Sequence, residues 1–264
     1  MQNVLLCLLL GTSIWAADIP ATTSGSSPED FKLEITGSAW LLNSAGAIHD
    51  AGNTIDLNSD LAVQQQQLTF FGKLVYKPGK KHRIVVEGAP FRLSGSNDVS
   101  RSITYRGQTF VVNTAIRSSA ALDYLFAGYQ YDLLSGPAGH LGVSVGGAYL
   151  NATGTISEAQ TAATATHTET LGLPLAGLEF RVFPVPGNHR FELDGGMRGM
   201  GFGDYGHYVE AAGNGGLVLG PVTLQAGYRA VNADLHESSP LHNGIAVRLV
   251  GPIFSLVWKW GGEH

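Results

Sequence analysis

The last strand-like segment alternates strictly between two kinds of side chain. Phe254, Leu256, Trp258 and Trp260 share one parity in the run that begins at Ile253. Because successive side chains of an extended strand point to opposite faces, this run has one wholly apolar face that ends in aromatic rings. A soluble protein would bury that face under a second layer. An outer-membrane barrel would expose it to lipid, with the aromatics at the interface.

The same period-two pattern recurs along the chain and predicts ten strands. Their expected limits are 31–42, 67–77, 81–94, 119–133, 140–152, 171–183, 189–202, 207–219, 222–235 and 243–260. Short connections rich in Gly and Pro alternate with longer polar ones, which is typical of barrels with short periplasmic turns and long outer loops. The exception is the short turn at 203–206, and if that hairpin were only a kink the barrel would have eight strands.

Charged residues keep to one parity in strand after strand, opposite the apolar side chains. Glu192, Asp194 and Arg198 alternate with Phe191 and Leu193, for example. An Arg or Lys that faces mid-bilayer lipid costs about 2–4 kcal/mol, so we expect the charged face to line the lumen and its opposite charges to pair. The predicted lumen charge network is Glu34, Lys73, Glu87, Asp123, Glu179, Arg181, Glu192, Asp194, Arg198, Glu210, Arg229 and Arg248.

Two places depart from simple alternation and predict β-bulges. In the last strand the apolar parity before Gly251-Pro252, at Leu249 and opposite Arg248, differs from the parity after it. In 121–131 the leucines and tyrosines do not share a parity. An extra residue inserted in one strand would account for each change.

Composition supports strands rather than membrane helices. Charged residues make up 14% of the 264, against a usual ~25%, and there are 35 glycines. The mean hydropathy is only +0.08, too polar for a helical membrane protein. The net charge of -5 argues against nucleic acid, which binds basic surfaces.

The sequence predicts four segments. Residues 1–16, with the apolar run 4–10, are typical of a cleaved secretory signal peptide. Residues 17–30 would form a short periplasmic N-terminal segment, 31–260 the barrel, and 261–264 a C-terminal tail.

Four phrases, together with the strand pattern, resemble a known group of proteins. They are TIDLNSDL at 54–61, YKPGKKHR at 76–83, AGYQYD at 127–132 and DYGHYV at 204–209. The chain resembles the small outer-membrane β-barrels of Gram-negative bacteria, broadly the outer membrane protein A-like and porin-like group. The resemblance implies an all-β transmembrane antiparallel barrel in the outer membrane and no particular reaction.

The final strand also resembles the C-terminal signal that the barrel-assembly machinery reads. That signal favours a terminal aromatic residue, a role that Trp260 would fill beside Phe254 and Trp258 as membrane-interface aromatics. The resemblance therefore implies two partners, the assembly machinery and the lipids of the outer membrane.

The sequence motifs that could indicate a catalytic, nucleotide-binding or metal-binding site are weak. GFGDYG at 201–206 matches G-x-G-x-x-G, but a strand-like run follows it where a nucleotide site needs a helix. His236-Glu-Ser238 is similar to the His-x-Ser pair of lipid A deacylases. Asp204, His207, Asp234 and His236 together are similar to the acid and His pairs of omptin proteases, if their loops are adjacent. Metal binding by His207, His236 and His242 lacks a short-spaced ligand pair.

We therefore expect a ten-stranded barrel whose lumen is mostly filled by side chains, with a non-enzymatic structural or surface-interaction role. The alternatives are a narrow passive pore for ions or small solutes and a hydrolase at the outer rim. The sequence predicts no catalytic residues, no cofactor, no metal and no nucleic acid, and it does not name an extracellular ligand.

Overall fold

The computed structural model describes residues 28–50, 52–98, 101–112, 114–158, 163–236 and 243–261. The predicted signal peptide, residues 17–27 and residues 262–264 lie outside this part of the chain. Within it, no helix is long and apolar enough to cross a bilayer.

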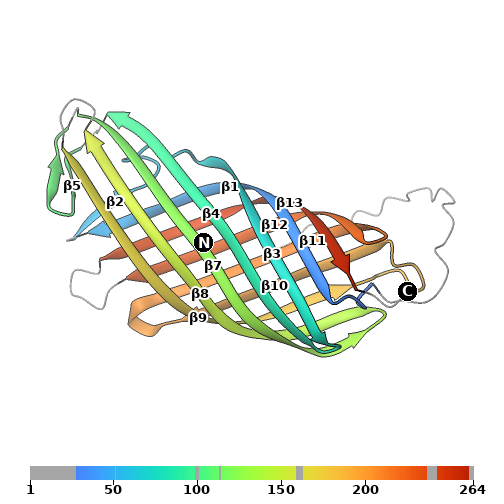
Figure 1. The fold of residues 1–264 in the computed structure, drawn as a ribbon. Helices are drawn as coiled ribbons and strands as arrows, with labels where there is room; N and C mark the ends of the chain where they lie inside the picture. The colour runs from blue at the N-terminus through green and yellow to red at the C-terminus, as the bar shows by residue number, and fades with distance from the viewer. Residues whose placement is uncertain are drawn as a thin grey trace, which may run out of the picture.

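Ten long antiparallel strands in the described ranges form one closed cylinder (Figure 1). Each strand pairs with its neighbours along the chain, and the last strand pairs with the first, with Leu33 opposite Trp260. The strands are β1 (Leu33–Asp50), β3 (Gln66–Gly79), β4 (His82–Asp98), β7 (Ala115–Gly136), β8 (Gly139–Glu158), β9 (Thr164–Val182), β10 (Phe191–Gly201), β11 (Gly206–Leu219), β12 (Val222–His236) and β13 (Gly244–Trp260).

All ten predicted strands are confirmed, and the eight-stranded alternative is wrong. β10 and β11 are separate strands that pair along their length, joined by the short 3-10 turn η1 (Gly203–Tyr205). Gly203 and Gly206 adopt φ of 61° and 97°, where glycine is favoured because it has no side chain to clash. The G-x-G-x-x-G spelling is therefore a hairpin turn between two strands.

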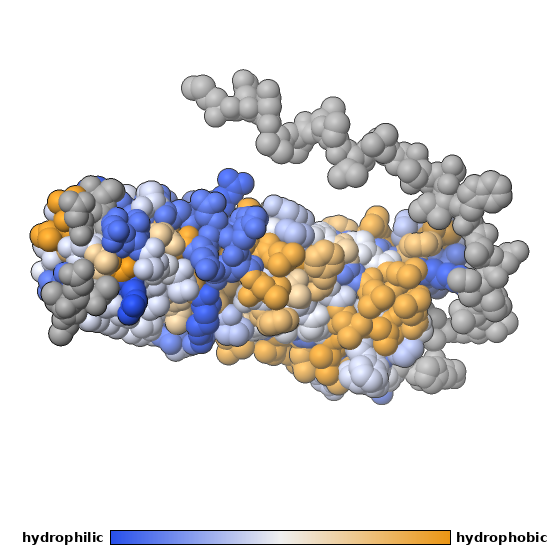
Figure 2. All heavy atoms as spheres, turned by 90° about the horizontal axis from the view of Figure 1, so that it is seen from above, coloured by the Kyte–Doolittle hydropathy of each residue, from blue (hydrophilic) through white to orange (hydrophobic). Residues whose placement is uncertain are grey.

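The strands are much longer than a bilayer requires. β7 has 22 residues and β8 has 20, whereas a membrane strand needs about 9–11. Figure 2 shows apolar side chains gathered toward the end with the short turns, and a hydrophilic band beside them. Beyond that band the outward side chains of β8 and β9 are polar, as in the hydrogen-bonded pair Thr153–Thr168. The barrel wall thus continues well past the apolar belt.

Three short strands that the sequence pattern did not reveal lie at this long-loop end. β2 (Asn53–Asp56) pairs with the end of β1, and β5 (Ile103–Tyr105) pairs with β6 (Gln108–Phe110) as a separate hairpin. Each has only three or four residues, too few for a period to be read.

The predicted bulge at Gly251-Pro252 is wrong. β13 keeps one register with β1 on both sides of that dipeptide, since Trp40 faces Ile253 and Asn43 faces Val250. Arg248 is accordingly exposed on the outer face while Leu249 is buried. The apolar side chains before the dipeptide face inward because the upper lumen is itself apolar.

The predicted bulge within 121–131 is also wrong. Residues 121–131 of β7 keep one register with both β4 and β8, with Tyr124 and Phe126 facing the lumen and Asp123 facing out. The register of β7 shifts instead between Asp132 and Leu134, beside the short turn.

Candidate functional site

Most residues of the predicted lumen charge network do face the lumen. Ten of the twelve residues face it: Glu34, Lys73, Glu87, Glu179, Arg181, Glu192, Asp194, Arg198, Glu210 and Arg229. Asp123 and Arg248 do not, and for these two the prediction is wrong. Both lie beyond the apolar belt, where an outward charge meets water or headgroups. A charge on the outer face therefore carries no lipid penalty there, and alternation does not force it inward.

Further lumen residues escaped the sequence reasoning. Arg83, Asp132 and Lys259 share the inward parity of β4, β7 and β13, so consistent use of the alternation would have found them. Glu29 precedes β1 and carries no strand parity, so no pattern pointed to it.

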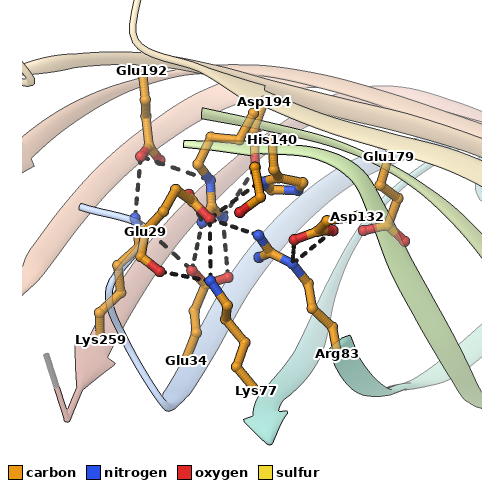
Figure 3. A network of polar contacts seen from close by, with 12 residues as sticks. Glu29, Glu34, Lys77, Arg83, Asp132, His140, Glu179, Glu192, Asp194 and Lys259 are labelled. Atoms are coloured by element: carbon orange, nitrogen blue, oxygen red, sulfur yellow. Dashed lines mark hydrogen bonds and ion pairs between the residues drawn. The ribbon is translucent and has the colours of Figure 1, made fainter. Parts of the chain in front are cut away.

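Glu29 lies at the centre of the layer near the short turns, surrounded by cationic groups from several strands (Figure 3). Its Oε2 accepts a 2.6 Å hydrogen bond from Arg83 Nη2, and its Oε1 a 3.2 Å bond from Arg181 Nη1. His140 Nδ1 lies 3.2 Å from Oε2, and Lys77 Nζ donates to the Glu29 carbonyl at 2.6 Å. Burial raises the pKa of the Glu29 carboxyl, but Arg181, His140 and Arg83 outweigh it and hold the pKa well below its ordinary value.

Phe31 completes this layer. Its buried ring has Lys77 Nζ at 4.7 Å and Lys259 Nζ at 5.7 Å from the ring centroid. Cations over an aromatic face are favourable, more so when shielded from water. The segment before β1 therefore folds into the mouth of the barrel and fills it with Glu29 and Phe31.

A direct ion pair crosses the lumen at the next level. Glu34 on β1 accepts hydrogen bonds from Arg181 on β9 at 2.8 and 3.1 Å. In the ring of ten strands, β9 lies five strands from β1 in either direction, so these two walls face each other. Glu192 and Lys259 extend the layer, with Lys259 Nζ 3.3 Å from Glu192 Oε2.

A second charged layer is centred on Arg198 of β10. Its guanidinium bonds to both Glu87 of β4 and Glu210 of β11. Arg229 Nη2 donates to Glu210 at 2.6 Å, and the Tyr124 hydroxyl donates to Glu210 at 3.2 Å. Because β4 and β10 lie four strands apart, this layer also spans the lumen.

The charges are close to balanced. The lumen acids are Glu29, Glu34, Glu87, Asp132, Glu179, Glu192, Asp194 and Glu210, and the lumen bases are Lys73, Lys77, Arg83, Arg181, Arg198, Arg229 and Lys259, with His140 beside Glu29. Pairing offsets the cost of removing each charge from water.

Above the charged layers the lumen is apolar. Trp40 is fully buried and meets the ring of Phe91 edge-on at a centroid distance of 6.0 Å. Its Nε1 donates to the Gly251 carbonyl at 3.2 Å, so its polar group is satisfied. Phe71 stacks beneath the Arg229 guanidinium at 4.3 Å, which joins this layer to the charged one.

A second apolar cluster closes the end with the long loops. Its buried members are Ile55, Leu57, Leu61, Val63, Ile103, Tyr105, Phe110, Ile116, Ile156 and Ala165. They come from the first two outer loops and from the walls of β7, β8 and β9. The two loops contact each other through an ion pair. Nε of Arg101, in the second outer loop, donates to Asp60 of the first outer loop at 3.1 Å.

A small cavity remains among the charged side chains. Its volume is about 120 Å³, and its walls include Glu34, Lys73, Glu179, Asp194 and Gln225. This is enough for several water molecules. The ion pairs that cross the lumen border this space.

The rim residues that resembled a hydrolase do not converge on the mouth of the barrel. His207 lies opposite Asp234 in the β11–β12 pair, but its Nε2 bonds to Asn232 at 2.8 Å. His236 Nδ1 is 3.7 Å from Asp234. His207, Asp234 and His236 share the outward parity, while Tyr208 and Ala233 of the same strands are buried in the lumen.

The other residues weighed for chemistry do not join them. Asp204 is exposed in η1, and Ser238 and His242 lie outside the described residues. Within the described ranges, no three His, Cys, Asp or Glu side chains are arranged to hold a metal ion.

Comparison with solved structures finds β-barrel proteins of bacterial outer membranes, and one of them, OmpT, shares the fold. The outer membrane protease OmpT from Escherichia coli is 12% identical, with a TM-score of 0.57 over 91% of this chain and 100% of that chain. The Ail protein of Yersinia pestis, in complex with a heparin analogue, is 12% identical with a TM-score of 0.41, over 85% and 99% of the two chains. The translocator domain of NalP from Neisseria meningitidis is 11% identical with a TM-score of 0.49, over 87% and 89%.

No protein-family model and no curated protein matches the chain. The likeness to OmpT is therefore one of fold: the chain has the closed antiparallel barrel fold of an outer-membrane protein, as the sequence pattern indicates, with an apolar belt on its outer face.

Proposed function

We propose that this protein is a closed, non-conducting barrel that serves the outer membrane as a structural element and displays its long outer walls and loops at the cell surface. The observation that carries the proposal is the Glu34–Arg181 ion pair, which joins opposite walls directly. The Glu29 and Phe31 plug, the Trp40 layer and the outer-loop cluster place further buried side chains at other levels of the barrel, and each would obstruct the same path.

A narrow pore is the second candidate, and the cavity among the charged groups favours it. About 120 Å³ lined by both signs of charge would suit a few waters and a small ion. A conducting path would have to displace Glu29, part the Glu34–Arg181 pair and open the apolar layer around Trp40.

Solute uptake by liposomes tests the proposal. Vesicles containing the purified full chain should swell in an isotonic pentose solution no faster than empty vesicles. A variant carrying both Glu29→Ala and Phe31→Ala should stay closed as well, because the Glu34–Arg181 pair lies behind that plug. Swelling of the wild-type vesicles would contradict the closed barrel and support the pore.

A further inference from the structure

The barrel wall has a seam between β3 and β4. The two strands pair from Gly79 and His82 only as far as Gly72 and Gly88. Beyond that point β3 continues to pair with β1 and β4 with β7, but β3 and β4 do not pair with each other. Backbone pairing returns further toward the long loops, where Val63 of the first outer loop bridges to Gly95 and Gln64 N donates to the Ser94 carbonyl.

A side chain replaces part of the missing ladder. Thr69 Oγ1 on β3 donates to the Pro90 carbonyl on β4 at 2.9 Å. Pro90 has no N–H to offer a neighbouring strand. Since unpaired backbone groups are costly in hydrocarbon, this substitute bond and the proline beside it indicate that the sequence accommodates the seam.

A groove runs along the outer surface at the start of this seam. Its floor is Gly37, Gly72 and Gly88, which lie side by side in register on β1, β3 and β4. A Cβ at Gly37 or Gly72 would meet no atom within 4 Å, so the space above the floor is open. Phe70 and Phe254 stand at its sides, and its volume is about 760 Å³.

The groove lies within the apolar belt. Ile35, Leu74 and Trp258 form the outward row on one side of the glycines, and Leu41 and Leu68 are further outward residues on the other. Only hydrocarbon or another membrane-embedded surface reaches this level.

A cationic group stands at the outer end of the groove. Arg92 lies four residues beyond Gly88 on β4, about 13 Å along the strand, and its side chain is 57% exposed. It bonds to Asp123 Oδ1 at 2.7 Å and to the Phe91 carbonyl, which leaves further N–H donors for an anion.

We propose that this groove binds one acyl chain of an outer-leaflet lipid whose anionic headgroup lies against Arg92. The glycine floor gives the chain close contact with the backbone, and the chain covers the seam from the membrane side. The gain comes from dispersion contacts, because the surrounding lipid is already apolar. The positive group at one end favours headgroups with a net negative charge over zwitterionic ones.

Native mass spectrometry of the full chain tests the site. The detergent-purified protein is stripped of lipid and titrated with phosphatidylglycerol or with phosphatidylcholine of the same chains. Wild type should retain one lipid and hold phosphatidylglycerol better. Gly72→Leu fills the open floor and should weaken retention about tenfold, which corresponds to about 1.4 kcal/mol. Arg92→Gln should reduce phosphatidylglycerol to the level of phosphatidylcholine.

Gly213→Leu is the matched control. Gly213 is also exposed on the outer face with no atom near its Cβ, but it lies on β11, away from the groove. This variant should retain lipid like wild type, and a gel shift between unheated and boiled samples verifies that each variant is folded. Equal retention by wild type and Gly72→Leu would overturn the site. Dimers that Gly72→Leu abolishes would overturn it in favour of an interface between two copies.

Discussion

Glu34 and Arg181 hold opposite walls of the barrel together through two hydrogen bonds of 2.8 and 3.1 Å. The two residues are 147 positions apart in the chain and five strands apart around the ring. In the closed barrel that we propose, the pair acts both as a structural brace and as a barrier to conduction at this level.

Arg181→Ala should destabilise the barrel by about 3–5 kcal/mol, because it leaves Glu34 and Glu29 buried without their principal cation. Unfolding by urea in detergent micelles measures the change. The exposed Arg92–Asp123 pair supplies the comparison, and Asp123→Ala should cost less than about 1 kcal/mol. Equal losses of unfolding free energy in the two variants would show that the lumen ion pairs stabilise the barrel no more than a surface pair does.

Stability should fall in acid partly through Glu29. The folded pKa of this carboxyl lies well below the ordinary value, so its contribution is complete above an unfolded pKa of about 4.3 and is lost as the pH falls through the folded value. Glu29→Gln should therefore lower the unfolding free energy at pH 7 and flatten its decline below about pH 4. Parallel pH profiles for the two proteins would show that Glu29 is not the group responsible.

Phe110→Ala should loosen the outer-loop cluster. Removing this buried ring costs about 3–5 kcal/mol locally and frees the loop that contains Arg101 and Arg106. Limited trypsin digestion should then cut at these arginines much faster than in wild type. Val111→Ala, at the exposed neighbouring position, is the control and should leave the digestion rate unchanged. Rapid cleavage of the wild type would contradict a packed outer end.

Gly206→Ala should disrupt the β10–β11 hairpin. Its φ is 97°, and an added Cβ would lie 1.8 Å from the Asp234 carbonyl oxygen, so we expect a loss of more than about 2 kcal/mol. Gly201→Ala meets no atom within 4 Å and has no positive φ, so it should change the urea midpoint little. If both variants unfolded like wild type, the turn would not depend on glycine at 206.

The alternation of apolar and polar side chains is sufficient to predict the ten strands, because lipid requires apolar side chains on the outer face of each strand. Glu192 and Arg198 could be assigned to the lumen from the sequence, since a charge on the lipid face of the belt is costly. Asp123 and Arg248 were assigned wrongly because they lie above the belt, where that cost disappears. The apparent bulge at Gly251-Pro252 has the same origin, since Leu249 faces an apolar part of the lumen.

Other features needed the three-dimensional structure. Glu29 acts from a segment without periodicity, and its partners come from β3, β4, β8 and β9. The short strands β2, β5 and β6 form because their apolar side chains share a cluster assembled from two loops and the barrel wall. Such contacts between distant segments leave no local pattern.

Planar-bilayer recording of the purified full-length barrel tests the central claim most directly. With the Glu34–Arg181 pair, the Glu29 plug and both apolar layers in place, the protein should insert without producing stable unitary current steps. Reproducible single-channel steps from the wild-type protein, absent from a mock preparation, would show that the lumen conducts and would contradict the closed barrel.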